Sequence, residues 1–389
     1  MRNVDPKVEE AIDTLNMKDG PTRRRLLSGA GLASATAAAS ALLAACSSGS
    51  SSGSTAKEAA GNFPKTPGWN FWFVNHVYAN PFFVPTQYGF QDAAALLGLP
   101  KPHWGGDAEN SSVPKMVQYL NNAVSAKASG IATTVINSTG FTAPVKNAMD
   151  AGIPVVTYNA DGLYKSDGTP VIGTNRLCYV GQALFNSGVQ MGNMIKKLVP
   201  GGGDIVIFIA TPGTGNIQPR YDGAASVLKS SGFTLHEIAT GAATSAELPA
   251  EKAFLSANKA KIKGAFAVDA GSTGFLAQAL TATGLKVPAG GFDLTTPTLN
   301  GIKAGTVNFT IDQEPYLQGF LPVLYLYLYN LSGGLVFPPN TDTGLTFVTK
   351  SNVGPYLNTK SRFEGSTAAQ KYIPRPSGPI SNPPATTST

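Results

Sequence analysis

Residues 131–159, IATTVINSTGFTAPVKNAMDAGIPVVTYN, carry the pattern that decides the fold. Two mostly apolar runs, IATTVIN (131–137) and IPVVTYN (153–159), enclose a helix-like stretch, FTAPVKNAMDAG. Continuous apolar runs that alternate with helices are typical of parallel strands covered on both faces. This segment therefore predicts a strand–helix–strand unit of a doubly wound α/β protein.

The same alternation recurs along the chain. WNFWFVN (69–75) precedes this segment, and DIVIFIA (204–210), GAFAVD (264–269) and AGGFD (289–293) follow it, each before a loop and a helix-like stretch. The 389 residues, of which 42% are hydrophobic and 13% charged, suffice for two domains. We therefore expect two α/β lobes. Periodicity leaves LYLYLYNL (324–331) open between a strand and a helix.

The N-terminal residues 1–45 resemble an export signal. An arginine cluster at 23–25 precedes an Ala/Leu stretch that ends in Leu43-Ala44-Ala45 before Cys46. This arrangement resembles a twin-arginine signal followed by a bacterial lipobox, and it predicts lipidation of Cys46. A transmembrane anchor is the alternative, because the apolar stretch is almost long enough to span a bilayer.

The segments that flank the predicted lobes have low-complexity compositions. Residues 46–67, which begin with SSGSSSGST after Cys46, are typical of a flexible linker, and residues 366–389 are Pro/Ser/Thr-rich like a disordered tail. We therefore expect a folded part that is lipid-anchored to the outer face of the cell membrane. With Cys46 lipidated, the remaining Cys178 has no disulfide partner, and we expect it to pack as a small apolar residue.

Charge and motif content argue against nucleic-acid binding and catalysis. The net charge is +6, but the basic residues are scattered and predict no nucleic-acid groove. His76, His103 and His236 show no metal-ligand spacing, and the G-x-S-x-G match at 49–53 lies in the linker composition. The sequence favours binding without turnover, and we expect no cofactor, no metal and a monomeric protein.

Polar residues stand where the predicted strands end. They are Asn75, Asn137, Asn159, Asp161, Asp269, Asp293, Asp312 and Gln313. In open α/β sheets, ligands bind outside the carboxyl ends of the strands. Asn and Asp at such positions also cap the helices that follow. Taken together, these residues predict a polar cleft.

Seven motifs occur in the order seen in one family of sugar-binding proteins. They are NPFF (80–83), INST (136–139), GIPVVTYNAD (152–161), RYDGA (220–224), AFAVDAG (265–271), GGFD (290–293) and FTIDQEPYLQG (309–319). From about residue 68 to 350 the chain resembles the ribose/galactose-type, or type I, periplasmic binding proteins of ABC transporters. Sugar-responsive repressors share the fold but carry an N-terminal helix-turn-helix, where this chain has its export-signal sequence.

The resemblance implies two Rossmann-like lobes that are joined by three hinge crossings and close on one ligand. We expect residues 68–170 with 313–338 to form the N-terminal lobe, and residues 171–312 with 339–365 to form the C-terminal lobe. The implied partners are a neutral sugar or polyol and an ABC permease. The same fold also serves ligand-sensing receptors that dock on a sensor kinase or chemoreceptor, and that alternative stays open. A carbohydrate-acting enzyme with Asp269 and Asp293 as paired carboxylates is a third hypothesis.

The resemblance and the strand ends together give a set of expected ligand contacts. In the family, the aromatics of NPFF hold a face of the sugar, the RYDGA arginine makes a bidentate contact to sugar oxygens, and the GGFD aspartate and hinge glutamine add polar contacts. The expected contacts are His76, Asn80, Phe82, Phe83, Asn159, Asp161, Arg220, Asp269, Phe292, Asp293 and Gln313. If only one of the adjacent phenylalanines covers the ligand, we expect it to be Phe83.

Three departures from the family pattern bear on the ligand. Asn159 stands where ribose-type relatives have an aspartate, Ala160 where they have an arginine, and Glu247 or Leu248 where they have a second-lobe aromatic. These changes remove a charged pair and weaken the case for a stacked pyranose ring. The expected ligand is a neutral monosaccharide or polyol, with pentoses, pentitols and cyclitols left open.

Overall fold

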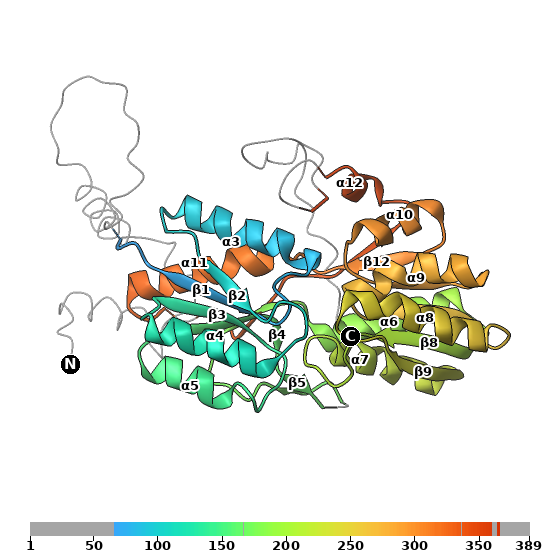
Figure 1. Cartoon of the computed structure of the whole chain (residues 1–389), viewed down its shortest axis with the longest axis horizontal. Coiled ribbons are helices and arrows are strands. Elements are labelled where there is room, and N and C mark those ends of the chain that lie inside the picture. The colour runs from blue at the N-terminus through green and yellow to red at the C-terminus, as the bar shows by residue number, and fades with distance from the viewer. Residues whose placement is uncertain (1–65, 166, 336, 360–363, 366–389) are drawn as a thin grey trace, which may run out of the picture. The chain divides into compact units, whose positions relative to one another are not determined.

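The computed structural model describes residues 66–165, 167–335, 337–359 and 364–365, which form two lobes (Figure 1). The predictions for the export signal, for Cys46, for residues 46–65 of the linker and for the tail at 366–389 lie outside these residues. Within the described ranges, no helix combines the length and apolarity that crossing a membrane requires.

The first lobe is built on a six-stranded sheet with the order β13-β7-β4-β3-β1-β2, in which all paired neighbours are parallel. Its strands are β1 (Phe71–Asn75), β2 (His103–Gly106), β3 (Gly130–Val135), β4 (Val155–Asp161), β7 (Tyr179–Gly181) and β13 (Asn340–Asp342). Its helices are η1 (Pro81–Phe83), α3 (Val84–Leu96), α4 (Val113–Ser125), α5 (Thr142–Asp150) and α11 (Leu317–Ser332). A short hairpin of β5 (Leu163–Tyr164) and β6 (Pro170–Val171) follows β4.

The second lobe is built on a sheet with the order β14-β12-β11-β10-β8-β9, in which only the edge strand β14 runs antiparallel to its neighbour. Its strands are β8 (Gly203–Ile209), β9 (Phe233–Ala239), β10 (Gly264–Ala267), β11 (Ala289–Phe292), β12 (Phe309–Asp312) and β14 (Thr346–Thr349). Its helices are α6 (Leu184–Leu198), α7 (Gln218–Leu228), η2 (Lys229–Ser231), α8 (Thr244–Asn258), α9 (Ala270–Thr283), α10 (Thr296–Ala304) and α12 (Gly354–Leu357).

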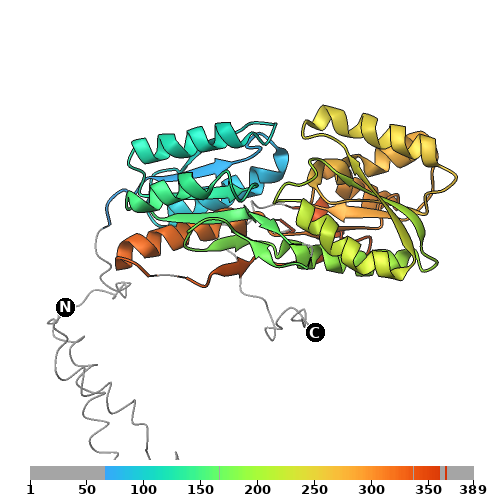
Figure 2. The same cartoon turned by 90° about the horizontal axis from the view of Figure 1, so that it is seen from below.

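Helices cover both faces of each sheet (Figure 2), which explains why the strand sequences are continuously apolar. In the first lobe, one hydrophobic cluster lies under α4 and α5 and another under α3 and α11. In the second lobe, the two clusters lie under α6 and α7 and under α8, α9 and α10. Cys178 is fully buried in the cluster under α3 and α11, which confirms its predicted packing role, and burial raises its pKa to about 11.

The open segment 324–331 is part of helix α11, which contains Pro322. Its alternating tyrosines and leucines resemble a strand, but the helix is fixed by its packing against α3. The two helices approach closely at Gly89 and Gly319, where an added Cβ would collide with the backbone of the facing helix. Tertiary packing thus decides the secondary structure of a segment whose periodicity was ambiguous.

The chain passes between the two sheets three times, at residues 182–183, 313–316 and 343–345. This arrangement confirms the predicted type I fold with its three crossings. The first sheet also includes β7 and β13, which lie beyond the lobe boundaries at 170 and 338 expected from the sequence. Both are three-residue strands, too short to leave a periodic signal.

Candidate ligand-binding site

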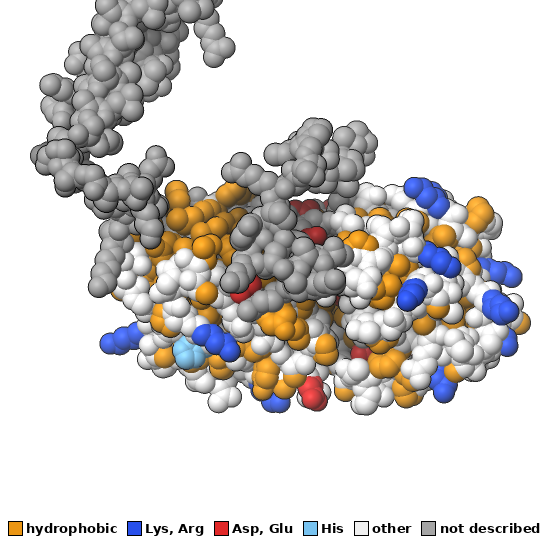
Figure 3. Space-filling model, turned by 90° about the horizontal axis from the view of Figure 1, so that it is seen from above, with side chains coloured by type: hydrophobic (Ala, Val, Ile, Leu, Met, Phe, Trp, Pro, Cys, Tyr) orange, Lys and Arg blue, Asp and Glu red, His pale blue; other side chains and the backbone are white. Residues whose placement is uncertain are grey.

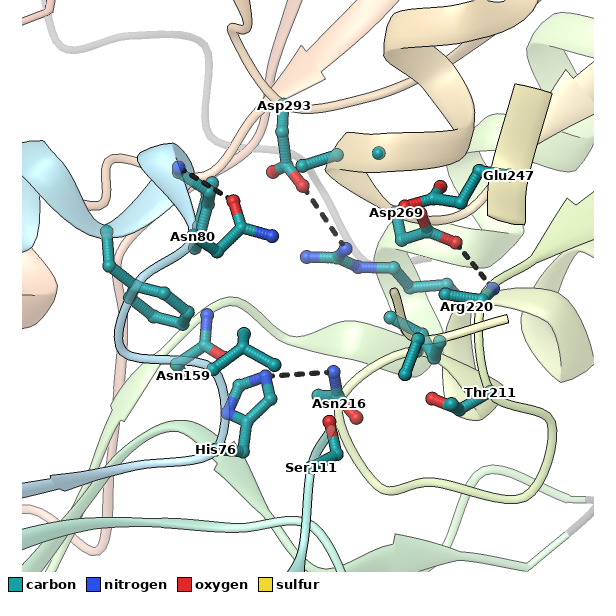
Figure 4. Close-up of a pocket in the computed structure, with 18 of the residues that line it drawn as sticks. His76, Asn80, Ser111, Asn159, Thr211, Asn216, Arg220, Glu247, Asp269 and Asp293 are labelled. Carbon is teal, nitrogen blue, oxygen red and sulfur yellow. Dashed lines mark hydrogen bonds and ion pairs between the residues drawn. The ribbon is translucent and has the colours of Figure 1, made fainter. Parts of the chain in front are cut away.

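A polar cavity of about 70 Å³ lies between the lobes, where the carboxyl ends of the strands of both sheets meet. The first lobe contributes the loop after β1, the turn before α4 and the end of β4, and the second lobe contributes the loops after β8, β9, β10 and β11 together with α7 and α8. Figure 4 shows side chains from both lobes pointing toward this space. The cavity therefore occupies the place where open α/β sheets bind ligands.

Most of the expected ligand contacts line this cavity. They are His76, Asn80, Phe82, Phe83, Asn159, Arg220, Asp269, Asp293 and Gln313. The other two, Asp161 and Phe292, are placed differently, each for a reason that the local contacts explain.

Asp161 forms a buried ion pair instead of facing the cavity. One carboxylate oxygen lies 2.5 Å from Nη2 of Arg176, and the other accepts hydrogen bonds from Nε of Arg176 at 3.1 Å and from the Thr157 hydroxyl at 2.5 Å. The side chains of Asp161 and Arg176 are only 7% and 5% exposed. Arg176 belongs to none of the seven family motifs, so no sequence pattern pairs it with Asp161.

Phe292 lies beneath a cavity residue and does not line the cavity. The guanidinium carbon of Arg220 lies 4.2 Å from the centroid of the Phe292 ring, which is fully buried. This contact is a cation–π interaction, and it holds the flat face of the guanidinium against the ring. Phe292 therefore positions Arg220.

Arg220 is the buried cation of the cavity. Its Nη1 donates to the carbonyl of Val268 at 3.0 Å and lies 4.0 Å from Oδ2 of Asp293, while its Nε has no hydrogen-bond partner among the described residues. Asp293 accepts a 2.6 Å hydrogen bond from Gln313 through its other oxygen. Burial raises the pKa of Asp293 to about 6, against the opposing effect of Arg220. The guanidinium and the carboxylate thus keep donor and acceptor capacity for a ligand.

Asp269 both caps a helix and lines the cavity. Its Oδ1 accepts from the backbone N–H of Ser272, which makes it the N-cap of α9, and its Oδ2 accepts from the N–H of Ala210 at 2.9 Å. Glu247, on α8, reaches the same region and accepts from the Ser272 hydroxyl at 3.0 Å. Burial, with Asp269 nearby, raises the pKa of Glu247 to about 8, so its carboxyl is neutral at pH 7 and can donate as well as accept.

His76 connects the first lobe to the second. Its Nε2 lies 3.2 Å from Nδ2 of Asn216, and its Nδ1 lies 3.2 Å from the hydroxyl of Thr134. Burial lowers the pKa of His76 to about 3, so the ring is neutral and accepts at Nε2 while Nδ1–H faces Thr134. Gly215, next to Asn216, also donates across the lobes to the carbonyl of Ile136 at 2.8 Å. These contacts hold the lobes in a closed arrangement.

The two adjacent phenylalanines have different surroundings. Phe83 is 1% exposed and belongs to the first-lobe core, where it meets His76 edge-on with ring centroids 5.4 Å apart. Phe82 packs edge-on against Phe83 at 4.7 Å but is only half-buried. Asn80 accepts from the N–H of Phe82 and starts the short η1 turn that carries both rings. Both rings line the cavity, and Phe82 is the more accessible of the two.

A hydrogen-bonded chain joins the cavity to the hinge. Asn159 donates to Gln318 at 3.0 Å, and Gln318 donates to the side-chain oxygen of Gln313 at 3.1 Å. Asn159 and Asp293 have φ angles of +61° and +75°, a left-handed conformation that non-glycine residues seldom adopt. Strained backbone of this kind clusters at ligand sites.

Several lining residues carry no signal that the sequence could have revealed. Ser111, Thr211 and Asn216 line the cavity from irregular loops, and Gln318 supports it from a helix. Glu247 is the exception, since the resemblance already marked that position as a departure. The structure places Glu247, and not Leu248, at the cavity.

Comparison with known proteins identifies the family. Residues 71–333 match the model of the periplasmic binding protein domain. The chain is 46% identical over 323 residues to the xylose/arabinose-binding protein XylF of Sulfolobus acidocaldarius, which covers 80% of this chain and 78% of that relative.

Two solved structures share the fold. An ABC transporter solute-binding protein from Burkholderia graminis in complex with D-arabinose is 25% identical to this chain, with a TM-score of 0.66. The match covers 74% of this chain and 97% of that protein. A carbohydrate transporter protein from Acidothermus cellulolyticus in complex with myo-inositol is 25% identical, with a TM-score of 0.64. The match covers 75% of this chain and 97% of that protein.

The fold and the cavity define a two-lobed protein that encloses a polar ligand. The chain belongs to the periplasmic binding protein domain family, and the resemblance stated from its sequence is confirmed. It is therefore an extracytoplasmic solute-binding protein and not an enzyme.

Proposed function

We propose that this protein binds a neutral monosaccharide or polyol between its lobes, with a pentose as the first candidate, and delivers it to the permease of an ABC importer. The observation that carries the proposal is the buried Arg220–Asp293 pair, whose two groups keep unused donors and acceptors toward the cavity. The name of the Sulfolobus relative, a xylose/arabinose-binding protein, supports pentoses in particular.

The charge balance of the lining supports a neutral ligand. Arg220 is its one permanent cation among the described residues, and it faces the carboxyl groups of Asp293 and Asp269. An acidic or phosphorylated ligand would meet these carboxyls without a surplus of positive charge. A neutral polyol instead presents hydroxyls that both donate and accept, which match carboxylate, amide and guanidinium groups.

The expected contacts follow from this chemistry. Arg220, Asp293, Asp269, Asn159 and Gln313 would answer the ligand hydroxyls. Asn80 and His76 would complete the polar contacts from the first lobe, and the ring of Phe82 would cover a C–H face. Closure would exclude water and strengthen each hydrogen bond.

Transport requires a change between open and closed lobes. The cross-lobe contacts of His76 with Asn216 and of Gly215 with Ile136 exist only when the lobes are together. A ligand that contacts both lobes favours this closed form, which the permease would recognise. A ligand-sensing receptor of this fold would use the same site and differ in its partner, so co-purification with a permease or with a sensor kinase separates the two functions.

The proposal also includes a lipid anchor on Cys46. The sequence Leu43-Ala44-Ala45-Cys46 supports lipidation of Cys46 after export. The chain should partition with membranes in its host and incorporate a labelled fatty acid, and Cys46→Ser should abolish that label. A wild-type chain that takes up no fatty acid would contradict this anchor.

A thermal-shift screen tests the ligand class. Pentoses, hexoses, pentitols and inositols are compared with amino acids and anions at equal concentration. A ligand present at a hundred times its Kd stabilises the folded state by about 2.7 kcal/mol, which raises Tm measurably. Shifts with amino acids or anions, and none with neutral polyols, would overturn the proposal.

A further inference from the structure

A second, mostly apolar cavity of about 430 Å³ adjoins the polar cavity. The two share the lining residues Asn80 and Phe82 from the first lobe and Ala270 and Gly271 from the second. Its volume falls within the range of roughly 300–1,000 Å³ that is typical of small-molecule sites. The space between the lobes therefore extends beyond the polar cavity.

About half of the residues that line this second cavity have large apolar side chains, and Asn80, three threonines and Glu364 add polar groups. Its apolar members are Pro81, Phe82, Pro85, Phe275, Leu294, Pro297 and Pro315. The one ionisable side chain among the described lining residues is Glu364, and burial raises its pKa to about 8. Raising this pKa favours the protonated carboxyl, and the apolar side chains around it favour burial of an apolar substituent.

Phe275 lines this cavity without being part of the hydrophobic core. It lies on α9, is half-buried and belongs to none of the hydrophobic clusters that the described residues form. It lines the apolar cavity and not the polar one. A half-buried aromatic ring that packs into no core and faces a cavity is available to a ligand.

We propose that the apolar cavity is a subsite for the aglycone of a glycoside, so that the protein accepts a sugar bearing an aryl or alkyl substituent. The inference rests on the proposed function, because the sugar ring must occupy the polar cavity. The two cavities meet at Phe82 and at Ala270 and Gly271, where α9 begins, and the proposal requires them to be continuous there. A substituent on the sugar would extend between these residues into the apolar cavity and lie against Phe82 and Phe275.

Calorimetry with the full chain tests the subsite. The probes are D-xylose, L-arabinose, and the methyl and 4-nitrophenyl glycosides of each in both anomers. For one anomer, the 4-nitrophenyl glycoside should bind at least about tenfold more tightly than the methyl glycoside, as expected for burying an aromatic ring. Phe275→Ser should remove this gain and leave the affinity for the free sugar unchanged. Gln278→Ser, at an exposed position of the same helix, should leave both unchanged.

The outcomes separate the subsite from the proposed function. Free sugar that binds while the 4-nitrophenyl glycosides show no gain would overturn the subsite and leave sugar binding intact. Equally tight binding of 4-nitrophenol alone would also overturn it, because the cavity would then be independent of the sugar site. A failure of every sugar and glycoside to bind would overturn both.

Discussion

Nδ2 of Asn216 lies 3.2 Å from Nε2 of His76, and this contact spans the two lobes across 140 positions of sequence. The imidazole is buried and neutral, and its other nitrogen faces the hydroxyl of Thr134. The ring therefore has one free acceptor, which Asn216 meets only when the lobes are together. The contact therefore stabilises the closed arrangement and does not need a ligand in order to form.

Asn216→Ala should weaken ligand binding through closure. The loss of one neutral hydrogen bond corresponds to about 0.5–1.5 kcal/mol, and it should appear mainly as faster dissociation. Stopped-flow measurement of the dissociation rate checks this, with Asn121→Ala at an exposed position of α4 as the control. An unchanged dissociation rate in Asn216→Ala would show that the contact does not hold the lobes together.

Arg220→Ala should abolish most of the affinity without unfolding the ligand-free protein. Each charged hydrogen bond lost from the ligand costs about 1.5–3 kcal/mol. Arg220→Lys should retain part of the affinity, because it keeps the charge but loses the planar fork. Calorimetry gives the affinities, circular dichroism tests the fold, and Lys146→Ala on the exposed face of α5 is the control. Equal affinities in wild type and Arg220→Ala would remove Arg220 from the site.

Breaking the Asp161–Arg176 pair should affect stability more than binding. Arg176→Met leaves a buried carboxylate without its cation, which typically costs about 3–5 kcal/mol. The double variant Asp161→Asn with Arg176→Met should recover much of this loss, because no uncompensated charge remains. Urea denaturation measures the stability. If the double variant folds well but loses its sugar affinity, Asp161 contacts the ligand after all.

The protein should be more stable at pH 5 than at pH 8. Burial raises the pKa of Glu247, Glu314 and Glu364 to about 8 and that of Glu251 to about 10. Their contribution is fully present below the unfolded value of about 4.3 and is lost as the pH rises through the folded values. His76 opposes this trend, since its depressed pKa costs stability as the pH falls below about 6.5, but one histidine is outweighed by four carboxyls.

Thermal unfolding across this pH range checks the prediction. Both carboxylate oxygens of the fully buried Glu251 have no hydrogen-bond partner among the described residues, so Glu251→Gln should flatten the pH dependence. Glu109→Gln at an exposed position should leave it unchanged. A Tm that rises from pH 5 to pH 8 would contradict the assignment of these groups as protonated in the folded state.

Basic side chains stand apart from one another on the face shown in Figure 3 and form no continuous band there. This agrees with the scattered Lys and Arg residues of the sequence. The absence of a nucleic-acid partner stays a prediction.

The sequence by itself determined the strand–helix alternation and the set of polar strand ends, because both depend on residues close together in the chain. Asp269 and Asp293 could be placed at one edge for this reason. Arg220 was expected there only through the resemblance, which the seven ordered motifs carry. The three-residue strands β7 and β13 are too short for such a pattern.

Only the tertiary structure decided the partners of the polar groups. Asn216 meets His76 across 140 residues and Asn159 meets Gln318 across 159, so no local pattern could pair them. Asp161 has the same sequence character as Asp293, yet one pairs with Arg176 and the other faces the cavity. A carboxylate that leaves water takes the nearest cation, and which cation is nearest depends on how the chain folds.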